Sequence, residues 1–313
     1  MTAELDLSVV IPVTARRDPI ESLYREYKNA LEADTYSFEF VYVLEARLQE
    51  TRAQLEALRA AGEPIRIVIL AKAFGEGTLL SAGFAYANGR LILTLPAFRQ
   101  IDPKEISGIL SAASENVEMV VARRYPRRGS RFNIFSSKVF HILLRSMLEF
   151  PFHDLGCSVR AFKRDLLNEL NLFGDHYLFL PLIAYVQGFR VTEHNAAQDE
   201  ADTGRRIYSA RFYLQRLLDI LTIIFLARFT RKPLRFFGLV GTATLSVGGI
   251  AVVWLCIERL FFGVPLADRP ALVLATLMVV LGIQMLAVGL IGELIIFVNS
   301  SETKEYVISE IIE

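Results

Sequence analysis

The stretch LSVVIPV, residues 7–13, is the first of five short apolar runs that decide the fold of the amino-terminal half. The other four are FEFVYVL (38–44), IRIVIL (65–70), RLILTL (90–95) and VEMVVA (117–122). Segments with helical patterns, at 18–33 and 51–61, lie between the first three runs. Near-continuous apolar strands separated by helices are typical of a parallel sheet that is covered on both faces. The sequence therefore predicts an α/β domain with a mostly parallel sheet.

Polar segments rich in arginine follow the predicted strands. In parallel α/β sheets, ligands bind beyond the carboxyl ends of the strands. We therefore expect the functional site to be built from the segments that follow the five strands, at 12–17, 45–47, 71–77, 95–100 and 123–131. After Phe132 the pattern becomes mainly helical.

Two long apolar runs lie near the carboxyl terminus. The run from Phe236 to Ile257 has no charged residue, and the run from Ala271 to Phe297 has one, Glu293. About 20 apolar residues in a helix cross a hydrocarbon core of roughly 30 Å. Four of the eight residues in Arg228–Arg235 are cationic, which predicts that this segment is cytoplasmic. We expect a multi-pass protein of the cytoplasmic (inner) membrane with both termini in the cytoplasm; a buried hairpin of soluble helices is the alternative.

The predicted domains follow from these patterns. They are a sheet domain at 1–205, juxtamembrane amphipathic helices at 206–232, two membrane helices at 233–300 and a tail at 301–313. The amphipathic segment mixes arginines with aromatic residues and suits the headgroup layer, although an ordinary surface helix has the same pattern. Glycines in the two apolar runs permit close approach of helix backbones and favour a homo-oligomer. Glu293 is expected to face a neighbouring helix or the membrane interface, because a carboxylate facing lipid is costly.

Charge and cysteine content exclude some classes of protein. Lysine and arginine together number 34, as do aspartate and glutamate, so no global positive field attracts nucleic acid. Cys157 and Cys256 are the two cysteines, one in the sheet domain and one in an apolar run, and we expect no disulfide between them.

Six segments, in order along the chain, resemble those of one enzyme family. They are SVVIP (8–12), AFGEGTLLSAGFAYANG (73–89), DLGCSVRAFKRDLL (154–167), FLPLIAYVQGFRVTEHN (179–195), KPLRFFGLVG (232–241) and GIQMLAVGLIGELI (282–295). The family is the polyprenyl-phosphate glycosyltransferases, a membrane-anchored branch of the family-2 glycosyltransferases related to dolichol-phosphate mannose synthase. The resemblance implies a nucleotide-diphospho-sugar transferase domain of the GT-A type. It also implies transfer of a sugar from a nucleotide sugar to a polyprenyl phosphate, such as undecaprenyl phosphate, at the cytoplasmic face of a bilayer.

The chain departs from this family at the metal site. The resemblance implies an Asp-x-Asp motif after the fourth strand, which would hold Mg²⁺ or Mn²⁺ against the leaving phosphates. At these positions the sequence reads Pro96-Ala97-Phe98, and neither Pro96 nor Phe98 offers a side-chain ligand. Gln100 still fits the flanking pattern. We therefore expect no metal cofactor.

Arginines crowd the end of the fifth strand. Guanidinium groups bind phosphate bidentately and stay charged, so arginines replacing the metal as a phosphate clamp is one hypothesis; a basic rim facing anionic lipid is the other. Together with the resemblance, this pattern predicts a nucleotide- or phosphate-binding set of Pro12, Glu45, Gln100, Arg123, Arg124, Arg127, Arg128 and Arg131. The resemblance makes Asp154 the candidate catalytic base, with helix capping as its alternative role.

Two functional hypotheses remain open at this point. The first is an active glycosyltransferase that works without the usual metal site. The second is an inactive relative, a pseudoenzyme that binds lipid phosphate, a nucleotide or a partner protein. The resemblance favours the first and the residues at 96–98 favour the second.

Overall fold

The computed structural model describes most of the chain. The described residues are 5–32, 36–72, 75–113, 116–127, 152–169, 180–203, 233–263, 265–266 and 269–299. Contacts divide the chain into two units, Met1–Ile207 and Tyr208–Glu313. The predicted amphipathic segment at 206–232 and the tail at 301–313 lie outside the described residues.

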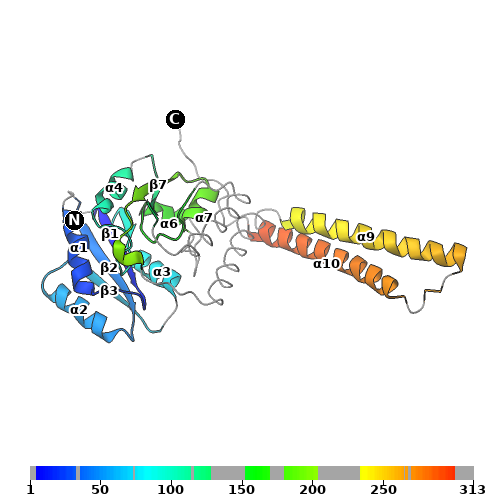
Figure 1. The fold of residues 1–313 in the computed structure, drawn as a ribbon, viewed down its shortest axis with the longest axis horizontal. Helices are drawn as coiled ribbons and strands as arrows, with labels where there is room; N and C mark the ends of the chain where they lie inside the picture. Colours follow the sequence, from blue (N-terminus) through cyan, green and yellow to red (C-terminus); the bar gives the residue numbers. More distant parts are fainter. Residues whose placement is uncertain are drawn as a thin grey trace. The chain divides into compact units, whose positions relative to one another are not determined.

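A seven-stranded sheet forms the centre of the first unit (Figure 1). Its strands lie in the order β3-β2-β1-β4-β6-β5-β7. Their bounds are β1 Leu7–Val13, β2 Phe38–Glu45, β3 Ile65–Leu70, β4 Leu91–Thr94, β5 Met119–Arg124, β6 Arg160–Lys163 and β7 Val191–Ala196. Strand β6 is antiparallel to both of its neighbours, whereas β1 pairs in parallel with β2 and β4, β2 with β3, and β5 with β7. The predicted sheet, mostly parallel, is confirmed.

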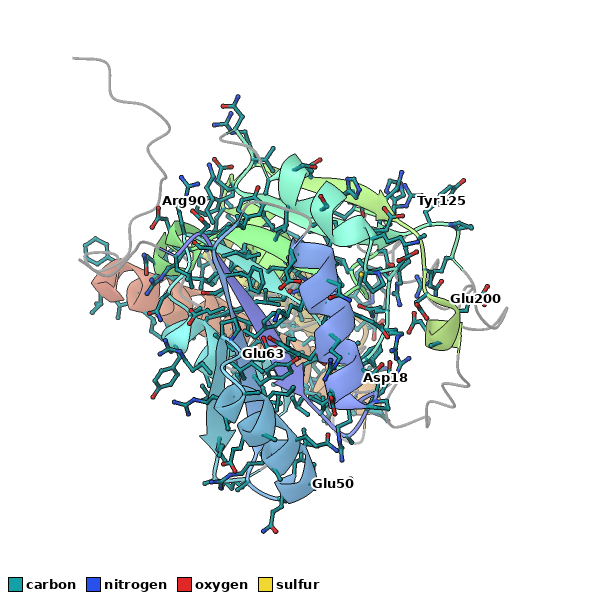
Figure 2. All side chains as sticks on the ribbon, turned by 90° about the vertical axis from the view of Figure 1, so that its left-hand side faces the viewer. Asp18, Glu50, Glu63, Arg90, Tyr125 and Glu200 are labelled. Atoms are coloured by element: carbon teal, nitrogen blue, oxygen red, sulfur yellow. The ribbon has the colours of Figure 1, made fainter. Side chains whose placement is uncertain are left out.

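Helices cover both faces of this sheet. Alternate residues of β1 point to opposite faces: Val9 and Ile11 belong to one buried cluster and Val10 to another. The first cluster contains side chains from α1 (Ile20–Glu32), α2 (Gln49–Ala60) and α4 (Glu105–Ala112). The second contains side chains from α3 (Glu76–Tyr86), α6 (Asp165–Glu169) and α7 (Leu180–Val186). Figure 2 views the unit from the side of α1 and α2, with Asp18 just before the first turn of α1.

Two strands differ from the sequence prediction. Beyond Phe132 the pattern was expected to be mainly helical, but β6 and β7 both lie in that part of the chain. Strand β6 reads RAFK and β7 reads VTEHNA, and neither has the apolar run that marks the other strands. The sheet supplies their stability instead, because β6 pairs on both sides and β7 pairs along β5. The described part of this region is still mainly helical, as predicted; the two strands were missed because short segments without an apolar run show no clear period.

Two long helices form the described part of the second unit. They are α9, Pro233–Phe262, and α10, Pro270–Asn299, and both are long and apolar enough to cross a membrane. Large apolar side chains such as Leu239, Trp254 and Phe297 are exposed along them. The two helices pack side by side in Figure 1.

Glycines bring the backbones of α9 and α10 close together. A Cβ carbon added at Gly282 would lie 2.6 Å from the amide nitrogen of Leu245, and one added at Gly248 would lie 2.8 Å from that of Val279. These glycines pack within one chain, so they no longer argue for a homo-oligomer, which stays a prediction. Glu293 accepts a hydrogen bond from the amide of Leu234 at the start of α9, at 3.4 Å. The expectation that Glu293 faces a neighbouring helix is confirmed.

Candidate functional site

The candidate site lies at the carboxyl edge of the parallel strands. The chain runs from β1 through β2 to β3 on one side of the sheet, and β4 then returns to the other side of β1. The crevice between the ends of β1 and β4 is therefore the switch point, where open α/β sheets bind ligands. Because β6 is antiparallel, its first residues and the loop before it reach the same edge.

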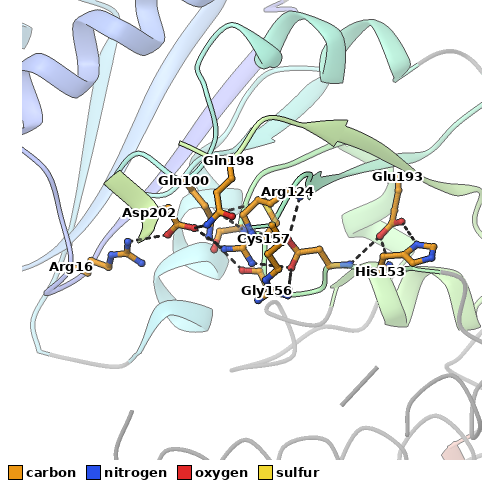
Figure 3. Close-up of polar contacts among 12 residues, drawn as sticks. Arg16, Gln100, Arg124, His153, Gly156, Cys157, Glu193, Gln198 and Asp202 are labelled. Atoms are coloured by element: carbon orange, nitrogen blue, oxygen red, sulfur yellow. Dashed lines mark hydrogen bonds and ion pairs between the residues drawn. The ribbon is translucent and has the colours of Figure 1, made fainter. Parts of the chain in front are cut away.

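A buried ion pair between Arg124 and Asp154 forms the centre of the site (Figure 3). Arg124 ends β5, and its Nε and NH2 groups donate to the two oxygens of the Asp154 carboxylate, at 2.7 and 2.9 Å. The Arg124 side chain is 2% exposed and that of Asp154 is 3% exposed. This two-pronged geometry fixes both side chains in one orientation.

A second carboxylate, that of Asp202, completes this buried cluster. Asp202 lies in a short 3-10 helix, Glu200–Thr203, and accepts hydrogen bonds from the NH1 of Arg124 at 3.0 Å and from the side-chain Nε2 of Gln198 at 2.8 Å. Its other oxygen accepts from Arg16, in the loop after β1, at 3.0 Å. Arg124 thus lies between two carboxylates, and Arg16 extends the cluster to the β1 side of the edge (Figure 3).

The charges in this cluster stabilise one another. Burial alone would raise the pKa of the Asp154 carboxyl, but the hydrogen bonds and charge of Arg124 hold that pKa below its ordinary value. Burial would likewise lower the pKa of Arg124, but the hydrogen bonds that it donates to Asp154 raise that pKa above its ordinary value. Asp154 is therefore a carboxylate held tightly by a cation, which makes it a weak proton acceptor. It is followed by a loop and by β6, so the helix-capping alternative is wrong.

Gln100, in the loop after β4, forms hydrogen bonds to the loop before β6. Its side-chain oxygen accepts from the amide of Ser158 at 2.8 Å, and its nitrogen donates to the carbonyl of Gly156 at 3.4 Å. Gln100 is 2% exposed. The structure therefore shows it binding the loop before β6, and its predicted contact with a nucleotide stays a prediction. Burial raises the pKa of the neighbouring Cys157 thiol to about 12, which leaves it protonated and unreactive.

Pro12 and Glu45 lie on the other side of the same edge. Glu45 ends β2, is buried, and accepts a hydrogen bond from Arg47. Pro12 lines a small pocket together with Glu76, Thr94 and Arg160. Arg160 is the first residue of β6, and burial lowers its pKa, although a guanidinium remains charged at neutral pH. It was not among the predicted site residues, even though it ends the Asp-x-Gly-Cys-x-x-Arg segment that the family resemblance rests on.

The remaining predicted arginines fall in different places. Arg123 lies 5.3 Å from the ring centre of Tyr125, and Arg127 lies 3.7 Å from an oxygen of Asp154. Arg128 and Arg131 lie outside the described residues. None of the phosphate contacts predicted for these arginines is tested by the fold, and they stay predictions.

Residues 96–98 do not suit a metal ion. Their side chains offer no oxygen or nitrogen, and their backbone carbonyls already accept hydrogen bonds. The hydroxyl of Tyr27 donates to the carbonyls of Pro96 and Phe98, at 3.1 and 3.2 Å. The amide of Asp18 donates to that of Ala97, at 2.8 Å. Within the described ranges, no group of three or more histidine, cysteine, aspartate or glutamate side chains is arranged to hold a metal ion.

Comparison with known proteins places the chain in a family. The model of the family described as glycosyl transferase family 2 matches residues 8–170, and the chain belongs to this family. An undecaprenyl-phosphate 4-deoxy-4-formamido-L-arabinose transferase of Pseudomonas paraeruginosa is 30% identical over 92% of this chain and 84% of its own length. The enzyme of the same name from Proteus mirabilis is 28% identical over 92% and 88%. The predicted resemblance to polyprenyl-phosphate glycosyltransferases is confirmed.

A solved structure shares the fold at low identity. Glucosyl-3-phosphoglycerate synthase of Mycobacterium tuberculosis, in complex with Mn²⁺, uridine diphosphate and phosphoglyceric acid, is 14% identical with a TM-score of 0.53. The match covers 72% of this chain and 79% of that one. The predicted GT-A-like α/β fold is therefore confirmed.

Two further residues of the site had little signal in the sequence. Asp202 lies in a polar stretch with no strand or helix pattern to mark it. Phe98 was noted only as a missing metal ligand, yet its ring lies against Arg16. Both were overlooked because their partners come from distant parts of the chain.

Proposed function

We propose that this protein transfers a sugar from a nucleotide sugar to a polyprenyl phosphate at the cytoplasmic face of a membrane. The observation that carries the proposal is the extent of the similarity to undecaprenyl-phosphate sugar transferases. It runs over nearly the whole chain, and so takes in both the sheet unit and the two apolar helices. A catalytic unit joined to two such helices suits an acceptor that resides in the bilayer.

The reaction exchanges one bond for another at a single carbon. A phosphate oxygen of the lipid bonds to the anomeric carbon of the sugar. The bond from that carbon to the distal phosphate of the nucleotide breaks, and the nucleoside diphosphate leaves with the electron pair. A lipid phosphate is already ionised, so the acceptor needs little help from a base. The larger requirement is positive charge near the leaving diphosphate.

The buried cluster holds the side chains at this edge of the sheet in fixed orientations. In this proposal, Asp154 acts mainly by holding Arg124 in place, because its carboxylate is occupied by that guanidinium. Arg16 and Arg127, on the outer sides of the cluster, keep 39% and 31% of their side chains exposed and give the edge a positive rim. The proposed nucleotide- or phosphate-binding set remains Pro12, Glu45, Gln100, Arg123, Arg124, Arg127, Arg128 and Arg131.

The proposed topology follows from the two helices and the basic segment before them. In this proposal the basic segment before α9 lies on the cytoplasmic side, and two spans return the chain to that side, so that the sheet unit and both termini are cytoplasmic. We retain the division at 1–205, 206–232, 233–300 and 301–313, and a homo-oligomer in the membrane, as parts of this proposal. Protease digestion of a carboxy-terminal tag in inside-out vesicles, with intact spheroplasts as the control, checks the topology.

A turnover assay tests the reaction itself. The full chain, purified in detergent, is incubated with undecaprenyl phosphate and a panel of nucleotide sugars, and lipid-linked sugar is measured. At least one donor is expected to give product, and product is expected to vanish when the lipid phosphate is omitted. Failure of every donor in the panel would overturn the proposal.

An inactive scaffold is the second candidate, and Pro96-Ala97-Phe98 is the observation that favours it. Calorimetry separates the two candidates. Binding of undecaprenyl phosphate or of a nucleotide without turnover would identify a pseudoenzyme that keeps the ancestral site. Turnover with any donor would eliminate it.

A further inference from the structure

Arg16 lies near the switch point, where contacts with Phe98 and Asp202 hold its side chain. It follows β1, and its guanidinium carbon lies 3.7 Å from the centre of the Phe98 ring, which follows β4. Its NH2 group lies 3.0 Å from the Asp202 carboxylate. The ring holds one face of the guanidinium plane and the carboxylate holds one edge, so the cation is oriented before any ligand arrives.

The placements of three other arginines at this edge differ from that of Arg16. Arg99 follows β4 but turns toward α1, where it donates to Glu26 at 2.6 Å and to Asp18 at 3.2 Å. Arg47 follows β2 and pairs with Glu45. Arg124 is enclosed by two carboxylates and is 2% exposed. Arg16, by contrast, keeps 39% of its side chain exposed while two partners hold it.

Residues 96–98, which stand where the family resemblance implies a metal-binding motif, also supply the ring that supports Arg16. A segment that offers no side-chain ligand and whose carbonyls already accept hydrogen bonds is a poor cation site. The same segment supplies an aromatic face, and that face carries a permanent cation. A guanidinium delivers several N–H donors to phosphate oxygens and stays charged over the whole working range of pH.

We infer that Arg16, stacked on Phe98 and tethered to Asp202, binds the diphosphate of the nucleotide sugar in place of a divalent ion. This inference rests on the proposed function, because it names the group that stabilises the leaving diphosphate. Binding of a nucleoside diphosphate is therefore independent of divalent metal. Asp202 orients the Arg16 guanidinium without contacting the diphosphate, and the Phe98 ring stacks against that guanidinium.

Calorimetry on the full chain in detergent tests the inference, with UDP, GDP and CDP as probes in turn. Binding of the best probe is expected to change less than twofold between EDTA and Mn²⁺. Arg16→Ala is expected to weaken it at least tenfold, and Arg16→Lys to recover only part of the loss because an ammonium lacks the planar face. Arg25→Ala removes an exposed cation that pairs with Glu21 on α1 and is expected to leave binding unchanged.

Several outcomes would contradict the inference. Binding that disappears in EDTA, or that survives Arg16→Ala unchanged, would overturn it, as would the absence of binding by all three probes. Thermal unfolding of the Arg16 variants shows that a loss of binding is not a loss of fold. Turnover that requires Mn²⁺ would leave the proposed function intact and overturn the metal substitution. Metal-free binding that depends on Arg16, without turnover, would support the metal substitution and overturn the proposed function.

Discussion

Two arginines, Arg124 and Arg16, pair with the same carboxylate and yet differ in their surroundings. Arg124 is buried between Asp154 and Asp202, whereas Arg16 lies on the other side of Asp202 with more than a third of its side chain exposed. A buried charge is retained because its partners would otherwise be left without compensation. An exposed charge contributes little to stability and remains accessible to a ligand. Burial, more than residue type, thus distinguishes the arginine that holds the fold from the one proposed to bind the diphosphate.

The largest expected effect comes from removing the buried arginine. Arg124→Ala leaves two buried carboxylates without their shared cation, and we expect a loss of about 3–5 kcal/mol in the free energy of unfolding. Arg16→Ala, the matched variant, should lose about 0–1 kcal/mol because its ion pair is partly solvated. Chemical denaturation in detergent measures both losses. Equal losses for the two variants would show that burial does not distinguish the contribution of Arg124 to stability from that of Arg16.

Lowering the pH should destabilise the buried pair of Arg124 and Asp154. The pKa of Asp154 is lower in the folded protein than in the unfolded chain, where it is about 3.9. Its ionised form therefore contributes stability that is fully present above about pH 4 and is lost as the pH falls through the folded value. Unfolding temperatures between pH 7 and pH 3 should fall less steeply for Asp154→Asn than for the unchanged chain. Parallel slopes would show that this carboxylate is not coupled to folding.

Restoring acids at the switch point should convert the exposed side to a metal site. A double variant, Pro96→Asp with Phe98→Asp, removes the aromatic support of Arg16 and introduces two carboxylates beside it. Nucleoside diphosphate binding in EDTA is expected to weaken about tenfold, or roughly 1.4 kcal/mol, and Mn²⁺ is expected to restore it. Calorimetry with and without Mn²⁺ gives the answer. Unchanged binding in EDTA would show that neither position matters to the diphosphate.

The smallest expected effect comes from removing the aromatic ring of Phe98. Phe98→Leu keeps an apolar side chain but removes the aromatic face under Arg16, and a cation–π contact at a partly exposed site is worth about 0.5–1 kcal/mol. The dissociation constant for the nucleoside diphosphate is expected to rise about two- to fivefold, while the unfolding temperature changes little. A loss as large as that of Arg16→Ala would mean that the ring contacts the ligand directly.

The sequence predicted the sheet edge better than the roles of the residues along it. Apolar runs marked β1 and β3 at their observed bounds; β1 is central and buried on both faces, whereas β3 is an edge strand that still keeps an apolar run. The strand pattern placed Arg124 at this edge and the family resemblance singled out Asp154, but neither could show that the two bind each other, because β5 and the loop before β6 are brought together only by the fold. Asp202 and β6 were missed for a related reason: a short polar segment carries no period of its own.

The antiparallel strand β6 makes the site a late product of synthesis. It inserts between β4 and β5, and the cluster needs Asp202, which precedes the first apolar helix by only a short length of chain. Strands β1 to β4 can pair as they emerge, since amino-terminal parts generally fold first. The charged centre closes only when most of the unit has been made. A truncated chain that stops before β7 would keep Asp154 beside Arg124 but would lack Asp202, the carboxylate that Arg124 and Arg16 share.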